Sequence, residues 1–164
     1  MIELIVLDVD GCLSNGQITY SEDEVEIKSF NVKDGLAIRS WGRLGKKIAI
    51  ITGRESKIVE RRAGELKVDF IHQGISDKAT LLNNIVDELG ITMQNVAAIG
   101  DDMNDYKMLK SVGLSFTPND GSKHIKEIVN TVLETKGGDG AVREMIELLL
   151  KRDNLEEEFL DLWR

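Results

Sequence analysis

The chain has 164 residues, of which 41% are hydrophobic and 30% are charged, a balance typical of a globular protein and not of a disordered one. We expect a single domain over residues 1–164, because this length suffices for one sizeable core but is short for two. The net charge of −8 argues against a broad basic face for nucleic acid. A single cysteine excludes an internal disulfide and a cysteine-based zinc site, and fits a reducing cytosol.

The N-terminal segment does not have the pattern of a targeting sequence. Residues 1–7 include Glu3 and contain neither a basic cluster nor a small-residue cleavage site, both of which a signal peptide has. No apolar run approaches the roughly 20 residues that span a bilayer. We therefore expect a cytoplasmic protein that contacts neither a membrane nor nucleic acid.

Short apolar segments alternate along the chain with longer stretches of helical spacing. The short segments, rich in Ile and Val, are residues 4–7, 46–51, 68–71, 96–99 and 114–116. Such near-continuous runs are typical of strands buried on both faces. In one longer stretch the apolar residues from Leu81 to Leu89 form a helical stripe, and Gly90 follows as a helix terminator. The alternation predicts an α/β fold, a three-layer, Rossmann-like parallel sheet flanked by helices.

Two segments depart from this alternation. Between residues 16 and 30, Ile18, Tyr20, Val25 and Ile27 alternate with polar residues on either side of an acidic turn, which predicts a β-hairpin. The hairpin follows the first strand directly, so we expect a small flap over the carboxyl edge of the sheet in place of a cap domain. Residues 153–164 place apolar side chains among acids and predict a docked amphipathic helix.

Two acidic clusters follow buried strands. Asp8-Val9-Asp10-Gly11 comes after the first strand, and the segment from Gly100 to Asp105, which includes Asp101 and Asp102, comes after the fourth. Ligands bind at this carboxyl edge in open α/β sheets. A calcium loop starting at Asp8 is excluded, because positions 12, 13 and 19 lack the required residues. The converging carboxylates would repel one another without a hard cation between them, which predicts a Mg²⁺ site.

Residues suited to phosphate follow other strands. Thr52-Gly53-Arg54 comes after the second strand and before a helix, where a hydroxyl and free backbone N–H groups can face the same edge. Lys78 lies near the start of another helix and can supply a point charge. Each alone is equally typical of a turn residue or a solvated lysine. Their order on successive strands, together with the acidic clusters, indicates a phosphate site.

This order of four motifs resembles the haloacid dehalogenase superfamily over most of the chain. Further segments, Phe30–Gly35, Arg54 with Arg62, and Gly137–Glu144, are similar to the capless 3-deoxy-D-manno-octulosonate 8-phosphate phosphatases. The resemblance implies a Mg²⁺-dependent phosphoric monoester hydrolase. It would convert this sugar phosphate to the free sugar acid and phosphate through an aspartyl-phosphate, in lipopolysaccharide precursor synthesis.

The resemblance also implies roles for individual residues. Asp8 would be the nucleophile and Asp10 the general acid and base, while Thr52 and Lys78 would hold the phosphoryl oxygens. Mg²⁺ would bind Asp8, the backbone carbonyl of Asp10, and Asp101, with Asp102 and Asp105 orienting its water and Lys78. The substrate-binding residues implied are Asp10, Asn31, Val32, Lys33, Asp34, Gly35, Arg39, Gly53, Arg54, Arg62 and Lys78. Arg39 and Arg62 are equally consistent with solvated or ion-paired positions on helices.

In this family the hairpins assemble four subunits and a neighbour's C-terminal segment closes the site, so the resemblance implies a homotetramer with shared active sites. Phe159 and Trp163 have the pattern of exposed residues that would serve this contact. Three alternatives stay open: a phosphatase for the nine-carbon nonulosonate 9-phosphate, a broader phosphosugar phosphatase, and a non-enzymatic tetramerisation module. The nine-carbon alternative arises because the family commonly has a basic residue where this chain has Asp139. Cys12 is interpreted as a small buried residue beside the nucleophile.

Overall fold

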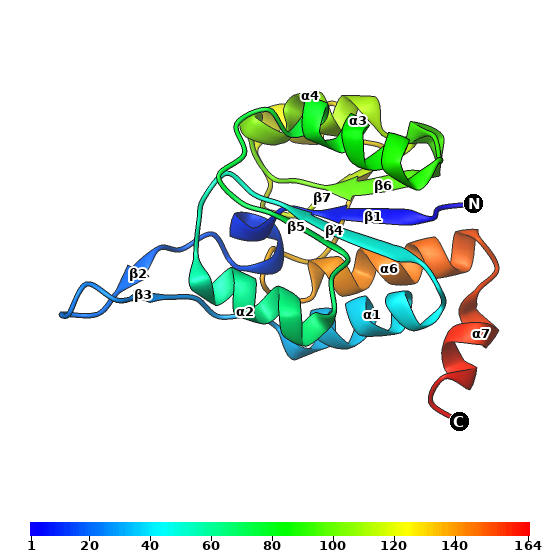
Figure 1. Ribbon diagram of the computed structural model, residues 1–164, viewed down its shortest axis with the longest axis horizontal. Coiled ribbons are helices and arrows are strands. Elements are labelled where there is room, and N and C mark those ends of the chain that lie inside the picture. Colours follow the sequence, from blue (N-terminus) through cyan, green and yellow to red (C-terminus); the bar gives the residue numbers. More distant parts are fainter.

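A computed structural model describes all 164 residues and confirms the α/β fold (Figure 1). A six-stranded parallel sheet has the order β5-β4-β1-β6-β7-β8. Its strands are β1 (Leu4–Leu7), β4 (Lys47–Ile51), β5 (Phe70–His72), β6 (Val96–Ile99), β7 (Leu114–Thr117) and β8 (Thr131–Val132). The helices are α1 (Val32–Arg43), α2 (Lys57–Leu66), α3 (Lys78–Leu89), α4 (Tyr106–Ser111), α5 (Lys123–Lys126), α6 (Ala141–Arg152) and α7 (Glu156–Asp161). None of these helices has the length and apolar character needed to cross a membrane.

Strand β1 lies at the centre of the sheet and sets the position of the site. It pairs in parallel with β4 on one side and β6 on the other, with Leu7 opposite Ile50 and Ile99. The pairing continues one residue further, because the Asp8 N–H donates to the Ile99 carbonyl at 3.2 Å. Parallel strands that start in register also end together. The residues after β1, β4 and β6 therefore meet at one carboxyl edge.

Both faces of the sheet are covered, so the strand side chains divide between two cores. On β1, Leu4 and Val6 pack into the core shared with α3 and α4, while Ile5 and Leu7 pack into the core shared with α1, α2 and α6. Figure 1 shows the two helical layers on opposite sides of the sheet. This is why the strands read as continuous apolar runs rather than as alternating ones.

The expected hairpin is present as β2 (Thr19–Tyr20) and β3 (Glu26–Ile27), which pair antiparallel. In Figure 1 it extends away from the body, at the end opposite to both termini. Ile18, Tyr20, Val25 and Ile27 are all exposed by 40% or more. The strand residues of the hairpin thus bury little apolar surface within this chain.

The C-terminal part differs from expectation in two respects. The amphipathic tail does form a docked helix, α7, but Phe159 is buried at 8% exposure and packs into the core beside α6, so its prediction as an exposed residue was wrong. Trp163 is 53% exposed, with the Arg43 guanidinium 5.1 Å from its ring centre. Strand β8 was not predicted, because two residues at the edge of a sheet leave too short an apolar run to recognise.

Candidate active site at the carboxyl edge of the sheet

A buried lysine joins the two acidic clusters. Lys78, the first residue of α3, is 2% exposed, and its Nζ lies 2.7 Å from Asp8 Oδ1 and 2.6 Å from Asp105 Oδ1. Burial alone would lower the pKa of Lys78, but Asp8 and Asp105 outweigh it and raise that pKa. Lys78 is therefore a fixed positive charge beside the Asp8 carboxylate.

Asp105 in turn shapes the second acidic loop, residues 100–105. Its Oδ2 accepts hydrogen bonds from the backbone N–H of Asp101 at 3.0 Å and of Asp102 at 3.4 Å. Gly100 permits this contact, because a Cβ there would lie 2.5 Å from the Asp105 side chain. Asp102 is exposed, and its side chain caps the following turn by accepting from Met103 N at 2.8 Å. Asp105 thus contacts both Lys78 and the backbone of its own loop, whereas the Asp102 carboxylate contacts only its own loop.

Asp8 and Asp101 form an acidic pair whose charge is not fully balanced. Burial, helped by Asp105, raises the pKa of Asp8 to about 7, and burial, helped by Asp8 and Asp105, raises the pKa of Asp101 to about 8. Oxygen atoms of the two carboxylates and Sγ of Cys12 lie within 4.8 Å of one another. Two crowded carboxylates that resist ionisation fit a hard divalent cation such as Mg²⁺, which would neutralise both. Cys12 itself is fully buried among apolar residues, as predicted.

Glycines and backbone bonds hold this edge together. Gly11 has a φ of +92°, and a Cβ there would overlap the Asp101 carboxylate, so only glycine allows the two acidic loops to come this close. Thr52 is 2% exposed, and its backbone bonds to His72 O and Ile75 N at 3.0 and 3.1 Å. Close packing at Gly11 and backbone hydrogen bonds at Thr52 therefore fix both residues at the carboxyl edge of the sheet.

Asp10 contacts Lys28, which the sequence did not predict as a site residue, and lies near Arg54, which it did. Lys28, just after β3, lies 2.5 Å from Asp10 Oδ1 and 3.1 Å from Glu26 Oε1. Arg54 lies between the same carboxylates, with Nη2 3.4 Å from Glu26 Oε1 and Nε 4.0 Å from Asp10 Oδ2. No sequence signal distinguished Lys28 from a solvated hairpin lysine. The structure shows instead that the hairpin contacts Asp10 through charged side chains.

The predicted sugar-acid residues lie in a second group. Asn31 caps α1 by accepting from Lys33 N at 2.8 Å, and Val32 and Lys33 are exposed. Gly35 makes room for Arg62, because a Cβ there would overlap the Arg62 guanidinium. Arg39 is half-buried on α1 and makes no ion pair. No hydrogen bond or ion pair joins these residues to Asp8, Asp101 or Lys78.

Asp34, a member of this group, has a structural contact of its own. It is 1% exposed, and its Oδ1 accepts from the backbone N–H of Arg143 at 2.8 Å, at the start of α6. Burial raises the pKa of Asp34 to about 6, against the opposing hydrogen bonds from the backbone of Arg143 and Val142. Its Oδ2 and the Nε of Arg62 are both buried without a hydrogen-bond partner. Asp34 therefore ties α1 to the start of α6.

The glycine segment before α6 packs on the first acidic loop, residues 8–14. Gly138 N donates to Cys12 O at 3.0 Å, and Gly137 N donates to Asp120 Oδ1 at 2.9 Å. A Cβ on Gly137 would overlap the carbonyl oxygen of Gly11 and lie 2.5 Å from its carbon. Asp139, by contrast, is exposed. The glycine motif thus packs on the backbone of Gly11 and Cys12, in the loop that carries Asp8 and Asp10.

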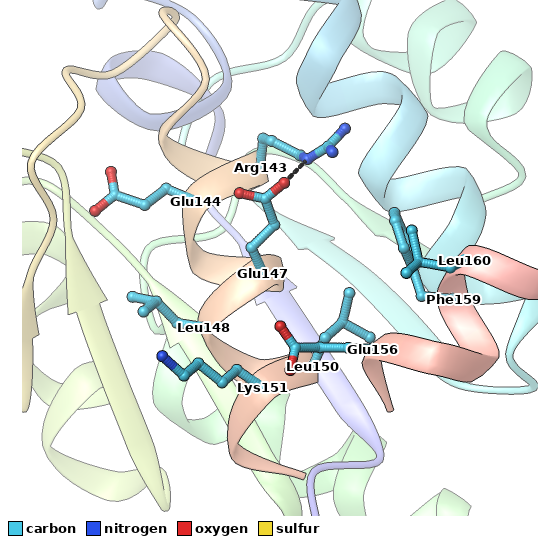
Figure 2. A pocket seen from close by; sticks show the side chains of 9 residues that line it. All are labelled: Arg143, Glu144, Glu147, Leu148, Leu150, Lys151, Glu156, Phe159 and Leu160. Atoms are coloured by element: carbon cyan, nitrogen blue, oxygen red, sulfur yellow. Dashed lines mark hydrogen bonds and ion pairs between the residues drawn. The ribbon is translucent and has the colours of Figure 1, made fainter. Parts of the chain in front are cut away.

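A cavity of about 350 Å³ lies elsewhere, between α6 and α7. Figure 2 shows Leu148, Phe159 and Leu160 around it, with the ion pair of Arg143 and Glu147 at its upper end. None of the predicted site residues lines this cavity. The acidic clusters at the sheet edge, rather than this groove, are the candidate active site.

Comparison with known proteins agrees with this geometry. A family profile for haloacid dehalogenase-like hydrolases matches residues 62–146. The 3-deoxy-D-manno-octulosonate 8-phosphate phosphatase KdsC of Escherichia coli K12 is 40% identical over 149 residues, covering 91% of this chain and 79% of that protein. The crystal structure of this phosphatase from Moraxella catarrhalis, in complex with magnesium, phosphate and KDO, has a TM-score of 0.95 at 40% identity, covering 99% of this chain and 94% of the other. The cobalt-bound phosphatase of Haemophilus influenzae has a TM-score of 0.89 at 35% identity, covering 93% and 90%.

The chain therefore belongs to the haloacid dehalogenase-like hydrolases, as its motif order predicts. Its 40% identity over most of both chains places it, within that group, in the family of the 3-deoxy-D-manno-octulosonate 8-phosphate phosphatases. The magnesium and cobalt in the two related structures are metals of those proteins. The acidic pair of this chain has the donor set that such ions require.

Proposed function

We propose that this protein is a Mg²⁺-dependent phosphomonoesterase that hydrolyses 3-deoxy-D-manno-octulosonate 8-phosphate to the free sugar acid and phosphate. The observation that carries the proposal is the buried contact of Lys78 with Asp8 and Asp105, beside Asp101. This contact places the Lys78 ammonium between the carboxylates of Asp8 and Asp105, at the edge where α/β sheets bind ligands. Family membership supports the same activity.

In this mechanism Asp8 attacks phosphorus and forms an aspartyl-phosphate, which divides a difficult hydrolysis into two easier transfers. Asp10 gives a proton to the leaving alkoxide and afterwards takes one from the attacking water. Lys78 stays charged and, with Thr52 and the backbone N–H of Gly53, holds the phosphoryl oxygens as they gain charge. Asp105 keeps Lys78 in place through its 2.6 Å contact.

Mg²⁺ would be held by Asp8, the Asp10 carbonyl and Asp101. When bound, it supplies the positive charge that allows an anionic phosphate to approach an anionic nucleophile. Asp102, which caps its own turn, would act on this site through the position of the loop rather than through its carboxylate.

The sugar acid would be bound by the cationic residues around the edge and by the Asn31–Gly35 segment, with Arg39, Arg54 and Arg62 suited to its carboxylate. We propose that the protein is a homotetramer in which neighbouring chains complete each site, as the resemblance to the octulosonate phosphatases implies. The exposed apolar side chains of the hairpin, among them Tyr20 and Ile27, support such an assembly.

Two observations bear on the alternatives. Arg54 stands beside Asp10, where it favours an acidic sugar over a neutral one, and the 40% identity to the octulosonate phosphatase supports the eight-carbon acid. Asp139 is exposed and lines a surface hollow with Lys33 and Arg143, so its charge would lower affinity for an acidic sugar bound there. The nine-carbon 9-phosphate, which carries the same carboxylate, is the second candidate substrate, and a broader phosphosugar range is the third.

The test is a phosphate-release assay on the eight-carbon and nine-carbon phosphates and simple sugar phosphates, with and without Mg²⁺. We expect release to need Mg²⁺, to be fastest with the eight-carbon substrate, and to vanish in Asp8→Asn. Asp87→Asn, an exposed acid on α3, is the matched control and should keep full activity. Full activity in Asp8→Asn would refute the nucleophile, and no release from any phosphate ester would favour a tetramerisation module without activity.

A further inference from the structure

The side chain of Lys28 is buried although it follows an exposed hairpin. Its side chain is 1% exposed, and its Nζ is enclosed between Asp10 Oδ1 at 2.5 Å and Glu26 Oε1 at 3.1 Å. A buried ammonium is costly unless it is paired and hydrogen-bonded, and here both carboxylates meet that need. The ion pairs of Lys28 with Asp10 and Glu26 are therefore a specific buried interaction and not a chance pair at the surface.

The hairpin is oriented to make this contact. Side chains two residues apart in an extended chain point the same way, so Glu26 and Lys28 share one side, toward the body. Val25 and Ile27 take the other side and are 59% and 47% exposed. This reverses the usual arrangement, in which apolar side chains face inward. The returning half of the hairpin presents charges, and not apolar groups, to the first acidic loop.

The two carboxylate oxygens of Asp10 have different surroundings. Lys28 binds Oδ1 at hydrogen-bond distance, whereas the closest cation to Oδ2 is Arg54 Nε at 4.0 Å, beyond a hydrogen bond. Arg54 is itself drawn to Glu26 at 3.4 Å. One oxygen of Asp10 is thus held by Lys28, whereas the other accepts no hydrogen bond.

We propose that Lys28 is a positioning residue, which fixes the Asp10 carboxylate through Oδ1 and leaves Oδ2 to exchange protons with the leaving group and water. This inference rests on the proposed role of Asp10 as general acid and base. It assigns the hairpin a part in the reaction of its own chain, in addition to any part in assembly. Lys28 acts only through Asp10 and does not touch the phosphoryl group.

The competing explanation is that Lys28 merely anchors the hairpin, and substrates with different leaving groups separate the two. A sugar alkoxide needs a proton as it leaves, whereas p-nitrophenolate is stable without one. Misplacing Asp10 should therefore lower kcat/KM, which reports the steps up to departure of the leaving group, much more for the sugar phosphate than for p-nitrophenyl phosphate; the later hydrolysis of the aspartyl-phosphate is common to both substrates. Loosening the hairpin should weaken binding of the sugar phosphate, and raise KM, without this dependence on leaving group.

The experiment is a double-mutant cycle of Lys28→Met and Asp10→Asn, with kcat and KM measured on both substrates at saturating Mg²⁺. Glu26→Gln is the matched anchoring control, since it weakens two ion pairs of the hairpin but leaves Lys28 on Asp10. Lys123→Met, at an exposed lysine of α5 without an ion pair, controls for loss of charge. Melting temperatures confirm that each variant is folded.

We expect Lys28→Met to lower kcat on the sugar phosphate by about 10- to 100-fold, as loss of an orienting contact does. Asp10→Asn should cost about 10²- to 10⁴-fold, and the double variant should be no slower than Asp10→Asn alone. The effect on p-nitrophenyl phosphate should be much smaller, and Glu26→Gln should keep most of its kcat.

The proposal is overturned by any one of four results: Lys28→Met matches Lys123→Met, kcat/KM falls equally on both substrates, the two single losses multiply in the double variant, or Glu26→Gln loses as much as Lys28→Met. Failure of the proposed function would be visible separately, as wild-type protein that leaves octulosonate 8-phosphate intact. The same cycle would then be run on the alkyl phosphate that it does hydrolyse, with the same pattern expected.

Discussion

Replacing Gly137 by alanine tests whether the glycine segment before α6 holds the first acidic loop in position. The added Cβ would overlap the Gly11 carbonyl oxygen and lie 2.5 Å from its carbon, with Ser14 O at 3.2 Å. Carbon atoms in contact lie about 3.5 Å apart or more, so the loop or the glycine segment must move by about 1 Å. Gly137 does not have a positive φ, so the effect of the substitution is purely steric.

The expected loss follows from that displacement. Overpacking of a close contact costs about 1–3 kcal/mol of unfolding free energy. A 1 Å misplacement of reacting groups can lower the rate about 10²-fold, and Asp8 and Asp10 lie on the loop that must move. The glycine segment cannot simply retreat, because Gly138 N is bonded to Cys12 O and Gly137 N to Asp120.

The assays are urea denaturation and steady-state phosphate release, with Gly64→Ala as the control. Gly64 lies within α2, and a Cβ there has no atom within 4 Å, so its replacement should stabilise the protein by about 0.5–1 kcal/mol without changing kcat. If Gly137→Ala were as active as Gly64→Ala, the glycine segment would not position the loop. A loss of stability with full activity would lead to the same conclusion.

Three further predictions concern charged residues. Asp105→Ala should lower the free energy of unfolding in urea by about 3–5 kcal/mol, because it removes one partner of the buried Lys78. Asp102→Ala should lower it by only about 1 kcal/mol, for a lost helix cap. Equal losses would contradict the central role of Asp105. Burial raises the pKa of Asp34 from 3.8 to about 6, so the folded state binds this proton more tightly than the unfolded chain does. The free energy of unfolding should therefore fall by up to about 3 kcal/mol as the pH rises through that interval. Asp34→Asn should flatten this part of the profile, and an unchanged slope would show that Asp34 does not cause it. Mg²⁺ at about 100 times its Kd should stabilise the protein by about 2.7 kcal/mol, measured as a rise in melting temperature relative to EDTA. Asp101→Asn should abolish this rise. A rise of the same size in the variant would place the ion elsewhere.

The sheet and the acidic pair were predictable because both follow from short-range patterns. Runs such as residues 96–99 are apolar at every position only when both faces are buried, and parallel strands bring their ends together. Asp8, Asp101 and Lys78 could therefore be placed at one edge without knowing any side-chain distance. The start of α3 at Lys78 followed from the same spacing that indicated its apolar stripe.

The contacts that were missed depend on how separate segments face each other. Lys28 meets Asp10 because the hairpin turns its charged side inward, and an alternating pattern does not say which side that will be. Phe159 is buried because α7 folds back on α6, which its acidic neighbours in the sequence do not reveal. The support of Gly11 by Gly137 joins segments far apart in the chain.

The central place of β1 has a consequence for folding. Asp8 and Asp101 follow strands that are neighbours in the sheet but are separated in the chain by β4, β5 and three long helices. The carboxylates meet only after this long loop has closed, which is a slow step in parallel sheets. A metal ion that binds both can therefore assist only after the centre of the sheet has formed, and it should slow unfolding while leaving the folding rate nearly unchanged.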